Sequence, residues 1–494
     1  MVANAPDCLC AATDRGWSPR QADCLKMEDC LCRTCRAGYP KFFSAQAGLK
    51  AVYQLSDETI FALSTAPARA ALAVIRLSGA ACDTALAALG IKALPQPRQA
   101  SLRSLHNPKD GALLDEALVV RLQAPHSFTG EAMAELHVHG GLAVIESVLE
   151  ALSALPGLRA AEAGEFTRRA VLNGKMDLTA AEAIADLIDA EGGAQQKQAL
   201  AQLRGGLRQR AESWRETLKT LLAHLEADLE FADEDLPGGI GQNALDALPD
   251  LHAELAAAMS DARGLRLRDG VRIAFVGAPN AGKSSILNML AGREAAIVSA
   301  RAGTTRDIIE VAMLLAGVPV TLIDTAGLRA AGDDIEREGV RRAIAWAEEA
   351  DIVVWVGAPD VPQPTALQDD VLAAHKGTAD LRIANKSDLA PMADDGALRL
   401  SAKTGAGEAA LLDALQKLVL QAAGSGESAP VTRARHVAIL REVLGHVAAA
   451  QNAAALELAA EDLRLAQRAL GRMTGAVDVE QLLDVVFADF CIGK

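Results

Sequence analysis

VRIAFVGAPNAGKSS, at residues 271–285, is the stretch that decides the fold. A strand-like run leads into a glycine-bearing turn, and a helix is predicted to begin where the glycines end. Residues 277–284 match the pattern G-x-x-x-x-G-K-[ST], in which backbone N–H groups and a helix N-terminus face phosphate oxygens. Lys283 can place its charge beside the terminal phosphates, and Ser284 can offer a hydroxyl to Mg²⁺. The stretch therefore predicts a nucleotide-binding domain of the α/β class.

Further strand-like runs follow and alternate with predicted helices, as a mostly parallel sheet covered by helices requires. They are LLAGVPVTLIDTAG at 314–327, ADIVVWVGA at 350–358 and DLRIANKSD at 380–388. The first and the third of these runs end in polar motifs that suit a nucleotide site.

These motifs predict which nucleotide is bound. In Asp324–Gly327 a carboxylate can hold Mg²⁺ through water, and a glycine N–H can sense the γ-phosphate. In Asn385–Asp388 the carboxylate of Asp388 can accept two N–H bonds from guanine that adenine cannot donate. Ser401–Lys403 fits the loop that supports the base. We therefore predict GTP rather than ATP.

Gly303–Asp307 lies between the P-loop and Asp324, where a threonine can close over the metal. Thr305 is the predicted Mg²⁺ ligand beside Ser284.

Leu328 stands where many GTP-hydrolysing proteins carry a glutamine that orients water. A leucine cannot do so, and another group must position the water and neutralise charge on the phosphoryl oxygens. The residues predicted to contact GTP are Asn280, Ala281, Gly282, Lys283, Ser284, Ser285, Ser299, Ala300, Arg301, Ala302, Gly303, Thr304, Thr305, Asp324, Thr325, Ala326, Gly327, Asn385, Lys386, Asp388, Ser401, Ala402 and Lys403.

Charge and hydropathy limit the classes of partner. The chain of 494 residues carries a net charge of −15, which argues against a broad basic surface for nucleic acid. Contact with RNA must then be local. Three basic stretches are candidates for it, at 204–210, 262–272 and 432–436. Such a stretch is more often a solvated helix face.

No apolar run is long enough to cross a bilayer, and the N-terminus lacks a signal-peptide core. We therefore expect a cytosolic protein that makes no membrane contact.

The length predicts two or three domains. Changes in residue composition and in periodicity along the chain predict five segments. They are a Cys-containing extension at 1–55, an α/β domain at 56–172, a helical segment at 173–268, the nucleotide-binding domain at 269–426 and a second helical segment at 427–494. The nucleotide-binding domain is thereby inserted between two helical segments that can pack together.

The extension holds six of the eight cysteines, within residues 1–35, and has no helical or strand period. Its CLCRTC run, at 30–35, could hold a soft metal but lacks the paired CxxC…CxxC spacing of a zinc site. A disordered extension, or a start codon assigned too far upstream, is the plainer interpretation. The rival hypothesis is a metal or redox sensor that regulates the switch. Activity that survives deletion of the residues before Ser56 would remove it.

Four stretches outside the nucleotide motifs resemble the MnmE (TrmE) family of tRNA modification GTPases. They are AVIRLSG at 73–79, SFTGEAMAELHVHGG at 127–141, AGEFTRRAVLNGKMDLTAAEAIADLIDA at 163–190 and FCIGK at 490–494. The resemblance runs from about Asp57 to Lys494, and ordinary GTPases lack these flanking pieces. It implies a tetrahydrofolate-binding-like α/β domain, a discontinuous all-α helical domain and an inserted P-loop, Ras-like G domain.

The resemblance also implies how GTP is hydrolysed. The family uses a potassium ion in place of an arginine finger, and its ligands correspond to Asn280, Ser299, Arg301 and Thr304. Ser299 replaces the usual threonine but still offers a carbonyl and a hydroxyl. Water activation falls on Glu336, which from the residues alone would be a solvated helix residue. The catalytic set implied is Glu336, Lys283, Asn280 and Cys491.

Folate contacts implied by the resemblance fall on Arg76, Glu135, Lys175 and Lys494. These charges suit the carboxylates and the pterin amide edge of a folate. Without the family, Arg76 and Lys175 would be surface charges and Glu135 an exposed strand residue.

Three further side chains near these motifs carry open alternatives. Cys491 is either a reactive thiol held near the folate or a buried, inert cysteine. His137 and His139 alternate on one strand, which could suggest a metal, but histidines that support the loop beside Gly140 are the stronger interpretation.

The resemblance implies a homodimer that forms a hetero-oligomer with the flavoprotein MnmG (GidA). Together they would install a carboxymethylaminomethyl-type group on C5 of the wobble uridine of certain tRNAs, with a tetrahydrofolate derivative as one-carbon donor. FAD is expected only on the partner, because this chain has no G-x-G-x-x-G fingerprint after a strand. Hydrolysis activated by K⁺ and by pairing of G domains would drive a conformational cycle. The alternative is a regulatory or ribosome-assembly GTPase, but such binding switches usually append an RNA-binding module instead of the four stretches.

Overall fold

The computed structural model describes residues 58–494, except for 231–238, 293–309, 325–340, 342–343, 363–364, 376, 378, 390–395, 427–430, 478–482, 484–485, 488–489, 491 and 494, and except for the side chains of 365–368, 372 and 379. The predicted Cys-containing extension at 1–55 lies outside the described residues. Residues 55–494 form one compact unit.

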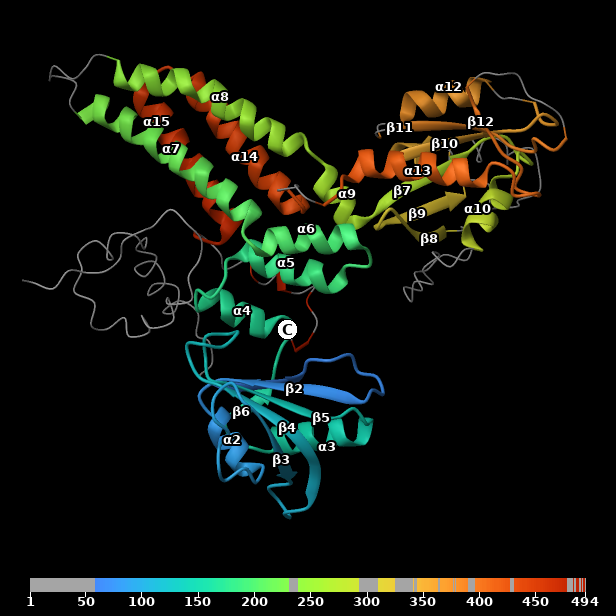
Figure 1. The fold of residues 1–494 in the computed structure, drawn as a ribbon. Helices are drawn as coiled ribbons and strands as arrows, with labels where there is room; N and C mark the ends of the chain where they lie inside the picture. Colours follow the sequence, from blue (N-terminus) through green and yellow to red (C-terminus); the bar gives the residue numbers. More distant parts are fainter. Residues whose placement is uncertain are drawn as a thin grey trace, which may run out of the picture. The chain divides into compact units, whose positions relative to one another are not determined.

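The first part of this unit is a six-stranded sheet with the order β3-β4-β5-β2-β1-β6 (Figure 1). Its neighbours pair antiparallel, apart from β1 and β6, which are parallel. The elements are β1 (Thr59–Leu63), β2 (Leu72–Ser78), β3 (Ala100–His106), β4 (Leu113–Leu122), β5 (Met133–His139), β6 (Leu158–Ala160), α2 (Cys82–Ala88) and α3 (Leu142–Ser153). Helices α2 and α3 bury one face of the sheet.

Alternation along β1 explains how both faces of that strand become buried. Phe61 points into the core under α2 and α3, whereas its neighbours Ile60 and Ala62 belong to a second cluster with Phe166. Successive strand residues face opposite sides, so an unbroken apolar run is buried on both faces. Phe166 comes from α4 (Glu165–Leu172), and α4 therefore covers part of the face opposite α2 and α3.

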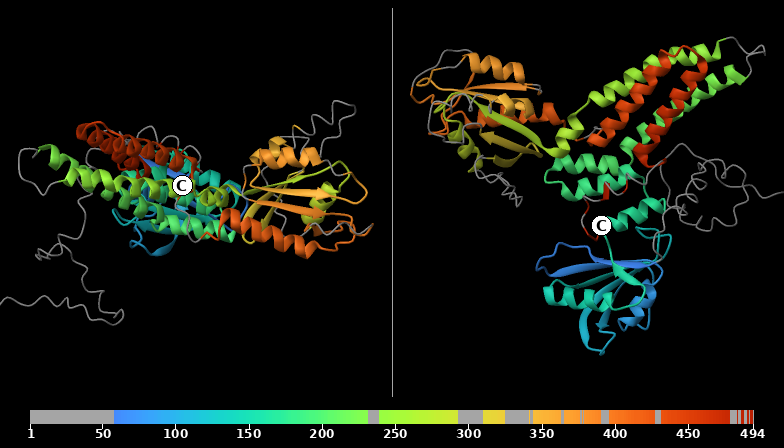
Figure 2. Two further views of the ribbon diagram at one scale, coloured as in Figure 1. Left: turned by 90° about the horizontal axis from the view of Figure 1, so that it is seen from above. Right: turned by 180° about the vertical axis from the view of Figure 1, so that it is seen from behind.

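The helical part consists of segments from both sides of the nucleotide-binding domain. After α5 (Leu178–Asp189) and α6 (Gly193–Leu203) come α7 (Gly206–Glu230), α8 (Ile240–Ser260) and α9 (Arg263–Asp269), while α14 (Ala434–Gln451) and α15 (Leu456–Thr474) follow the domain. Helices α7, α8, α14 and α15 lie side by side in both views of Figure 2 and share one core rich in leucine and alanine. The two helical segments thus pack together.

The second sheet has the order β12-β11-β10-β7-β9-β8 and is parallel except for the β8–β9 hairpin. Its elements are β7 (Val271–Val276), α10 (Lys283–Ala291), β8 (Glu310–Leu315), β9 (Val318–Asp324), β10 (Ile352–Gly357), α12 (Thr365–Ala374), β11 (Ala379–Ala384), β12 (Leu398–Arg399) and α13 (Glu408–Ala423). Every residue of β10 is buried, as expected for a strand inside a parallel sheet. The α/β and all-α classes predicted from the sequence are confirmed.

The end of the chain returns to the first sheet. Ile492 forms a β-bridge with Ala163, and the Oγ atom of Ser64 donates to the carbonyl of Gly493 at 3.0 Å. A side chain on Gly164 would lie 3.0 Å from atoms of Phe487, so only glycine fits there without a shift. The described part of FCIGK therefore lies against the domain that begins more than 400 residues earlier.

Among the described helices, none is both long enough and apolar enough to cross a membrane.

Candidate nucleotide-binding site

Strand β7 delivers the P-loop to the start of α10. Gly277 has φ +151°, and a Cβ there would lie 2.2 Å from the carbonyl oxygen of Val356. Gly282 caps α10 in the left-handed region, and Asn280 also has a positive φ, of 64°. Glycine adopts such a backbone without strain, and the turn exposes N–H groups at a helix N-terminus. The local geometry is that of a phosphate cradle.

Lys283 folds back over this loop. Its ammonium group donates to the carbonyls of Gly277, at 2.7 Å, and Ala278, at 3.0 Å. Burial lowers the pKa of Lys283, while the nearby carboxylate of Asp324 opposes that shift. The loop carbonyls thus hold a cation at the turn, where an anionic phosphate would meet it.

Two oxygen-bearing side chains meet beside the P-loop. The hydroxyl of Ser284 donates to the carboxylate of Asp324 at 2.5 Å. They meet because β7 and β9 are parallel neighbours, with Phe275 in register with Asp324. Mg²⁺ prefers oxygen ligands and usually keeps several waters, so a hydroxyl with a carboxylate close by fits this ion. Ser284 would bind the metal directly, and Asp324 would hold it through water.

Asn385 links the P-loop to the loop expected to support the base. Its Nδ2 atom donates to the carbonyl of Ala281 at 2.9 Å, and its Oδ1 atom accepts from the N–H of Ala402 at 3.1 Å. Asn385 is buried, and a Cβ on Gly282 would lie 2.2 Å from its Nδ2 atom. Glycine at 282 therefore serves the side chain of Asn385 as well as the backbone turn.

Neighbouring side chains orient the carboxylate of Asp388, which the sequence predicts to recognise guanine. Ser401 donates from its hydroxyl to Asp388 at 2.7 Å, and this bond lowers the pKa of Asp388. An ionised carboxylate is acceptor-only, as recognition of guanine N–H groups requires. Lys386 has φ +57°, and its ammonium donates to Asp360 at 2.6 Å. Asp360 follows β10 in a loop with no recognised pattern, and sequence reasoning missed it.

Some predicted residues lie outside the described part of the chain. These are Ser299, Ala300, Arg301, Ala302, Gly303, Thr304, Thr305, Thr325, Ala326, Gly327, Leu328, Glu336, Cys491 and Lys494. The predicted potassium and water-activating residues, except Asn280, are all among them.

The predicted folate residues lie in the first domain. Arg76 and Glu135 are register partners on β2 and β5, and Arg76 donates from Nε, at 3.2 Å, and from Nη2, at 3.0 Å, to one oxygen of Glu135. The guanidinium also lies 5.7 Å from the ring centre of Phe128 and 5.9 Å from that of Phe166. Lys175 donates to the carbonyl of Pro125 at 2.8 Å. The tertiary structure therefore pairs Arg76 with Glu135.

A buried network behind this pair was missed by sequence reasoning. Arg169, only 2% exposed, donates to Glu165 at 2.9 Å and to Glu131 at 3.1 Å. Glu131 also accepts from the hydroxyl of Ser78 at 2.7 Å. All four residues fall within the quoted stretches AVIRLSG, SFTGEAMAELHVHGG and AGEFTRRAVL, which is the signal that could have found them.

His137 and His139 have separate partners. His137 contacts Glu135 at 3.3 Å, whereas His139 contacts Asp115 at 2.7 Å through its ring and at 2.8 Å through its N–H. Across the described residues, no group of three or more His, Cys, Asp or Glu side chains is arranged to hold a metal.

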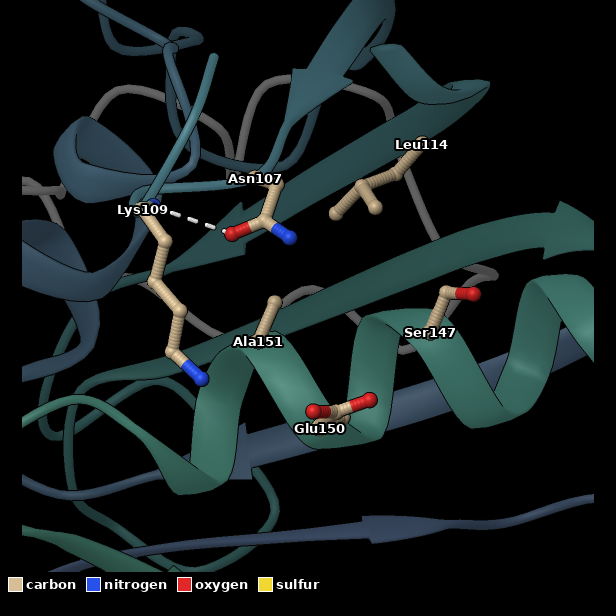
Figure 3. A pocket seen from close by; sticks show the side chains of 6 residues that line it. All are labelled: Asn107, Lys109, Leu114, Ser147, Glu150 and Ala151. Carbon is tan, nitrogen blue, oxygen red and sulfur yellow. Dashed lines mark hydrogen bonds between the residues drawn. The ribbon is translucent and has the colours of Figure 1, made fainter. Parts of the chain in front are cut away.

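The first domain also has a small hollow of about 80 Å³ (Figure 3). It is lined by Asn107, Lys109, Leu114, Ser147, Glu150 and Ala151, none of which is a predicted site residue. Two of the lining residues are bonded to each other, because the N–H of Lys109 donates to Oδ1 of Asn107 at 3.0 Å within one turn. The hollow is thus a feature of the β3–β4 connection against α3.

The mostly parallel second sheet carries a P-loop, a hydroxyl–carboxylate pair that suits Mg²⁺ and a carboxylate that suits guanine. Together these features define a P-loop GTP-binding protein.

The family model of the MnmE helical domain matches residues 178–491, and the family model of the GTP-binding protein TrmE N-terminus matches 59–175. The tRNA modification GTPase MnmE of Parvibaculum lavamentivorans is 52% identical over 88% of this chain and 100% of its own length. That of Gluconacetobacter diazotrophicus is 52% identical over 88% of this chain and 98% of its own length. The chain belongs to the MnmE family and is a GTPase.

Two solved structures are similar to part of this chain. The G domain of the T. maritima FeoB iron transporter is 25% identical, with a TM-score of 0.24, and the alignment covers 31% of this chain and 98% of that one. Era bound to MgGDPNP and ribosomal RNA nucleotides is 23% identical, with a TM-score of 0.24, over 30% of this chain and 56% of that one.

Proposed function

We propose that this chain is the GTP-hydrolysing component of the system that modifies C5 of the wobble uridine in tRNA with a carboxymethylaminomethyl-type group. It would act with the flavoprotein MnmG and a tetrahydrofolate one-carbon donor. The observation that carries the proposal is the presence, in one compact unit, of a P-loop with the Ser401–Asp388 bond and of an Arg76–Glu135 pair on a second domain. A plain binding switch has no use for the second feature.

The chemistry of the Arg76 region supports a folate. The guanidinium presents a planar donor group close to two aromatic rings, and Glu135 offers a carboxylate that can accept from a pterin amide edge. Lys175 adds a second cation to the same domain. In this proposal Arg76, Glu135, Lys175 and Lys494 bind the folate, which supplies a one-carbon unit when bound.

The anchored C-terminus supports a role for FCIGK near that site. Gly493 is bonded to Ser64, and the N–H of Ser64 donates to the carbonyl of Val74, two residues before Arg76 on β2. Cys491 and Lys494 are within two residues of Gly493 along the chain, and consecutive Cα atoms are about 3.8 Å apart. On this ground we propose that Cys491 and Lys494, which lie outside the described residues, act at the folate site.

We also propose that the chain is a homodimer through its first domain. Leu102 and Leu118 are register partners, 61% and 41% exposed, and Leu72 is 54% exposed on the same face of the sheet as Arg76. Exposed leucines gathered on one face mark an interaction surface. A second copy would cover them and bring two folate sites close to one interface.

For hydrolysis we propose Mg²⁺ on Ser284 and Thr305, K⁺ on Asn280, Ser299, Arg301 and Thr304, and water activation by Glu336. Asn280 has a left-handed backbone within the P-loop turn, a conformation that asparagine adopts more readily than most residues, and its place in this turn supports the role. Pairing of two G domains would complete the K⁺ sites. The domain boundaries at 56, 173, 269 and 427 and a cytosolic location complete the proposal.

The test compares steady-state GTP hydrolysis by the full chain in matched KCl and NaCl buffers, followed by wobble-uridine modification with added MnmG, folate donor and tRNA. We expect hydrolysis to depend strongly on K⁺ and modification to require GTP. Equal hydrolysis in both salts would remove the proposed role of Asn280. If modification proceeds equally well without this chain, the regulatory or ribosome-assembly alternative takes its place.

A further inference from the structure

Two chain connections join the G domain to the helical domain, and α5 contacts both. The incoming connection is α9, which ends just before β7, and the outgoing one precedes α14. Asp186 of α5 accepts from Arg268 of α9 at 3.0 Å and from Arg433, at the start of α14, at 2.5 Å. These two arginines are 165 positions apart in sequence, yet they share one carboxylate.

Glu182, one turn before Asp186, holds the outgoing connection more deeply. It accepts two hydrogen bonds from Arg435, both at 3.0 Å, and one from His436 at 2.9 Å. Its side chain is 3% exposed, and Arg435 also donates to the carbonyls of Arg472 and Met473 at the end of α15. Removing one partner of a buried charge pair leaves the other charge uncompensated, so these bonds fix the connection to α5.

Helix α6 makes the direct contact with the G domain. The N–H of Ala194 donates to the carbonyl of Gly317 at 3.1 Å, and the buried Ala194 side chain belongs to the G-domain core. Gln195 and Gln198 donate to the carbonyls of Arg268, at 2.9 Å, and Gly264, at 3.1 Å, on α9. These bonds occupy backbone acceptors of α9, so α6 and α9 are held together.

Gly192 makes the approach to Gly317 as close as two backbones allow. A Cβ on Gly192 would lie 2.1 Å from the carbonyl oxygen of Gly317, so any side chain forces the two apart. The backbone of Gly192 has φ −123°, which every residue adopts, and glycine is therefore required here for space and not for conformation.

Gly317 is the turn of the β8–β9 hairpin, and this hairpin reaches the nucleotide site. Strand β9 runs from Val318 to Asp324, whose carboxylate accepts from Ser284. The N-terminal end of β8 follows the segment that carries Thr305. Strand β9 therefore runs from the turn that is bonded to α6 to the carboxylate beside Ser284.

We propose that this joint, formed by Gly192 and Ala194 against Gly317 and by Asp186 between Arg268 and Arg433, transmits the nucleotide state of the G domain to the helical domain. The hairpin moves α6, and α5 carries the displacement to the start of α14 through its carboxylates. Coupling of this kind needs a contiguous set of contacts between two sites.

The main test uses hydrogen exchange of backbone amides in the full-length protein, with GDP or a non-hydrolysable GTP analogue bound. The variant is Gly192→Ala, and the matched control is Gly193→Ala, because a Cβ on Gly193 meets nothing within 4 Å. We expect wild type and Gly193→Ala to show a nucleotide-dependent change of protection in α5, α6 and the first turn of α14. Gly192→Ala should lose that change while retaining its rate of GTP hydrolysis.

A second pair of variants tests the carboxylate link. Asp186→Asn removes the shared acceptor, and Glu226→Gln is its control, because Glu226 pairs with Arg464 on the exposed surface of the same domain at 2.8 Å. We expect Asp186→Asn to lose the nucleotide-dependent change in α14 but not in α6. If wild type shows no such change, or if both Gly192→Ala and Asp186→Asn retain it, the joint is not a transmission element. Hydrolysis rates in the same samples show separately whether the GTPase itself works.

Discussion

Asn385 donates from Nδ2 to the carbonyl of Ala281, 2.9 Å away, and so ties the guanine-recognition loop to the P-loop. The same side chain accepts from the N–H of Ala402. One buried amide thus links the P-loop to the loop at Ser401–Lys403.

Replacing Asn385 with alanine should weaken binding of GTP and GDP equally. The change leaves the Ala281 carbonyl and the Ala402 N–H without this partner, at a cost of about 2 kcal/mol, or roughly thirtyfold in Kd. Isothermal titration calorimetry with both nucleotides measures the effect. Asn452→Ala is the control, because Asn452 makes an exposed bond to the carbonyl of Ala448. Loss of affinity for only one nucleotide would contradict the prediction.

Asp388→Asn should change which base is bound. The carboxylate accepts two guanine N–H bonds, whereas an amide offers one acceptor and a donor that suits the extra carbonyl of xanthine. GTP binding should fall by at least roughly 100-fold, and xanthosine triphosphate should bind better than it does to wild type. Competition for a fluorescent nucleotide gives both values. Asp413→Asn, in an exposed pair with Lys417 on α13, should leave both unchanged.

Arg76→Lys should impair folate binding without altering GTP hydrolysis. Lysine keeps the charge but loses the planar group that lies near the rings of Phe128 and Phe166 and donates twice to Glu135. We expect affinity for a tetrahydrofolate derivative to fall about tenfold, or about 1.4 kcal/mol. Equilibrium dialysis measures it, with Arg103→Lys, an exposed change on β3, as control. Unchanged folate affinity would remove Arg76 from the proposed site.

Stability should fall as the pH drops below about 6.5, because of His436. Burial lowers the pKa of His436, and the neighbouring Glu182 only partly opposes this shift, so the folded protein resists a proton that the unfolded chain accepts. Between pH 7.5 and 5.5 the loss from this group should be about 1 kcal/mol. His436→Gln, which keeps a donor for Glu182, should abolish this part of the loss in urea unfolding. His446→Gln, at a half-exposed pair with Asp462, should not.

Glu182 should add a second loss of stability at lower pH. Burial raises the pKa of Glu182, but the hydrogen bond from His436 and the charge of Arg435 outweigh it and lower the pKa to about 2. Its contribution is therefore complete above the ordinary pKa of 4.5 and is lost as the pH falls from there towards 2. The Glu182→Gln variant should be less stable than wild type at pH 7. Acid unfolding of this variant should lack the loss of stability that Glu182 causes in wild type.

The G domain and its P-loop could be predicted from the sequence because their motifs are local. Residues 277–284 carry the turn, the helix start and the lysine in one contiguous stretch, and the Asn385–Asp388 motif follows a single strand. Each strand of a parallel sheet delivers its following loop to the same edge, so local motifs become one site without further information.

The stretch at 432–436 is a case in which local sequence could not predict the partners of the charged residues. Its basic residues suggested a solvated helix face or a contact for RNA, but Arg433, Arg435 and His436 are paired with carboxylates of α5. Arg266 and Arg268, in the stretch at 262–272, pair with Asp351 and Asp186 in the same way. A run of basic residues does not reveal whether its partners in the folded protein are water and RNA or buried carboxylates from another segment.

The sequence by itself therefore determined the G domain, the choice of GTP and the family, because those depend on short motifs whose backbone and chemistry are set by neighbouring residues. Only the tertiary structure decided that Arg76 meets Glu135, that Asp186 joins Arg268 to Arg433, and that Gly192 must lack a side chain. Each of these contacts joins residues that are dozens to hundreds of positions apart. Only packing of the folded chain brings such residues within hydrogen-bonding distance.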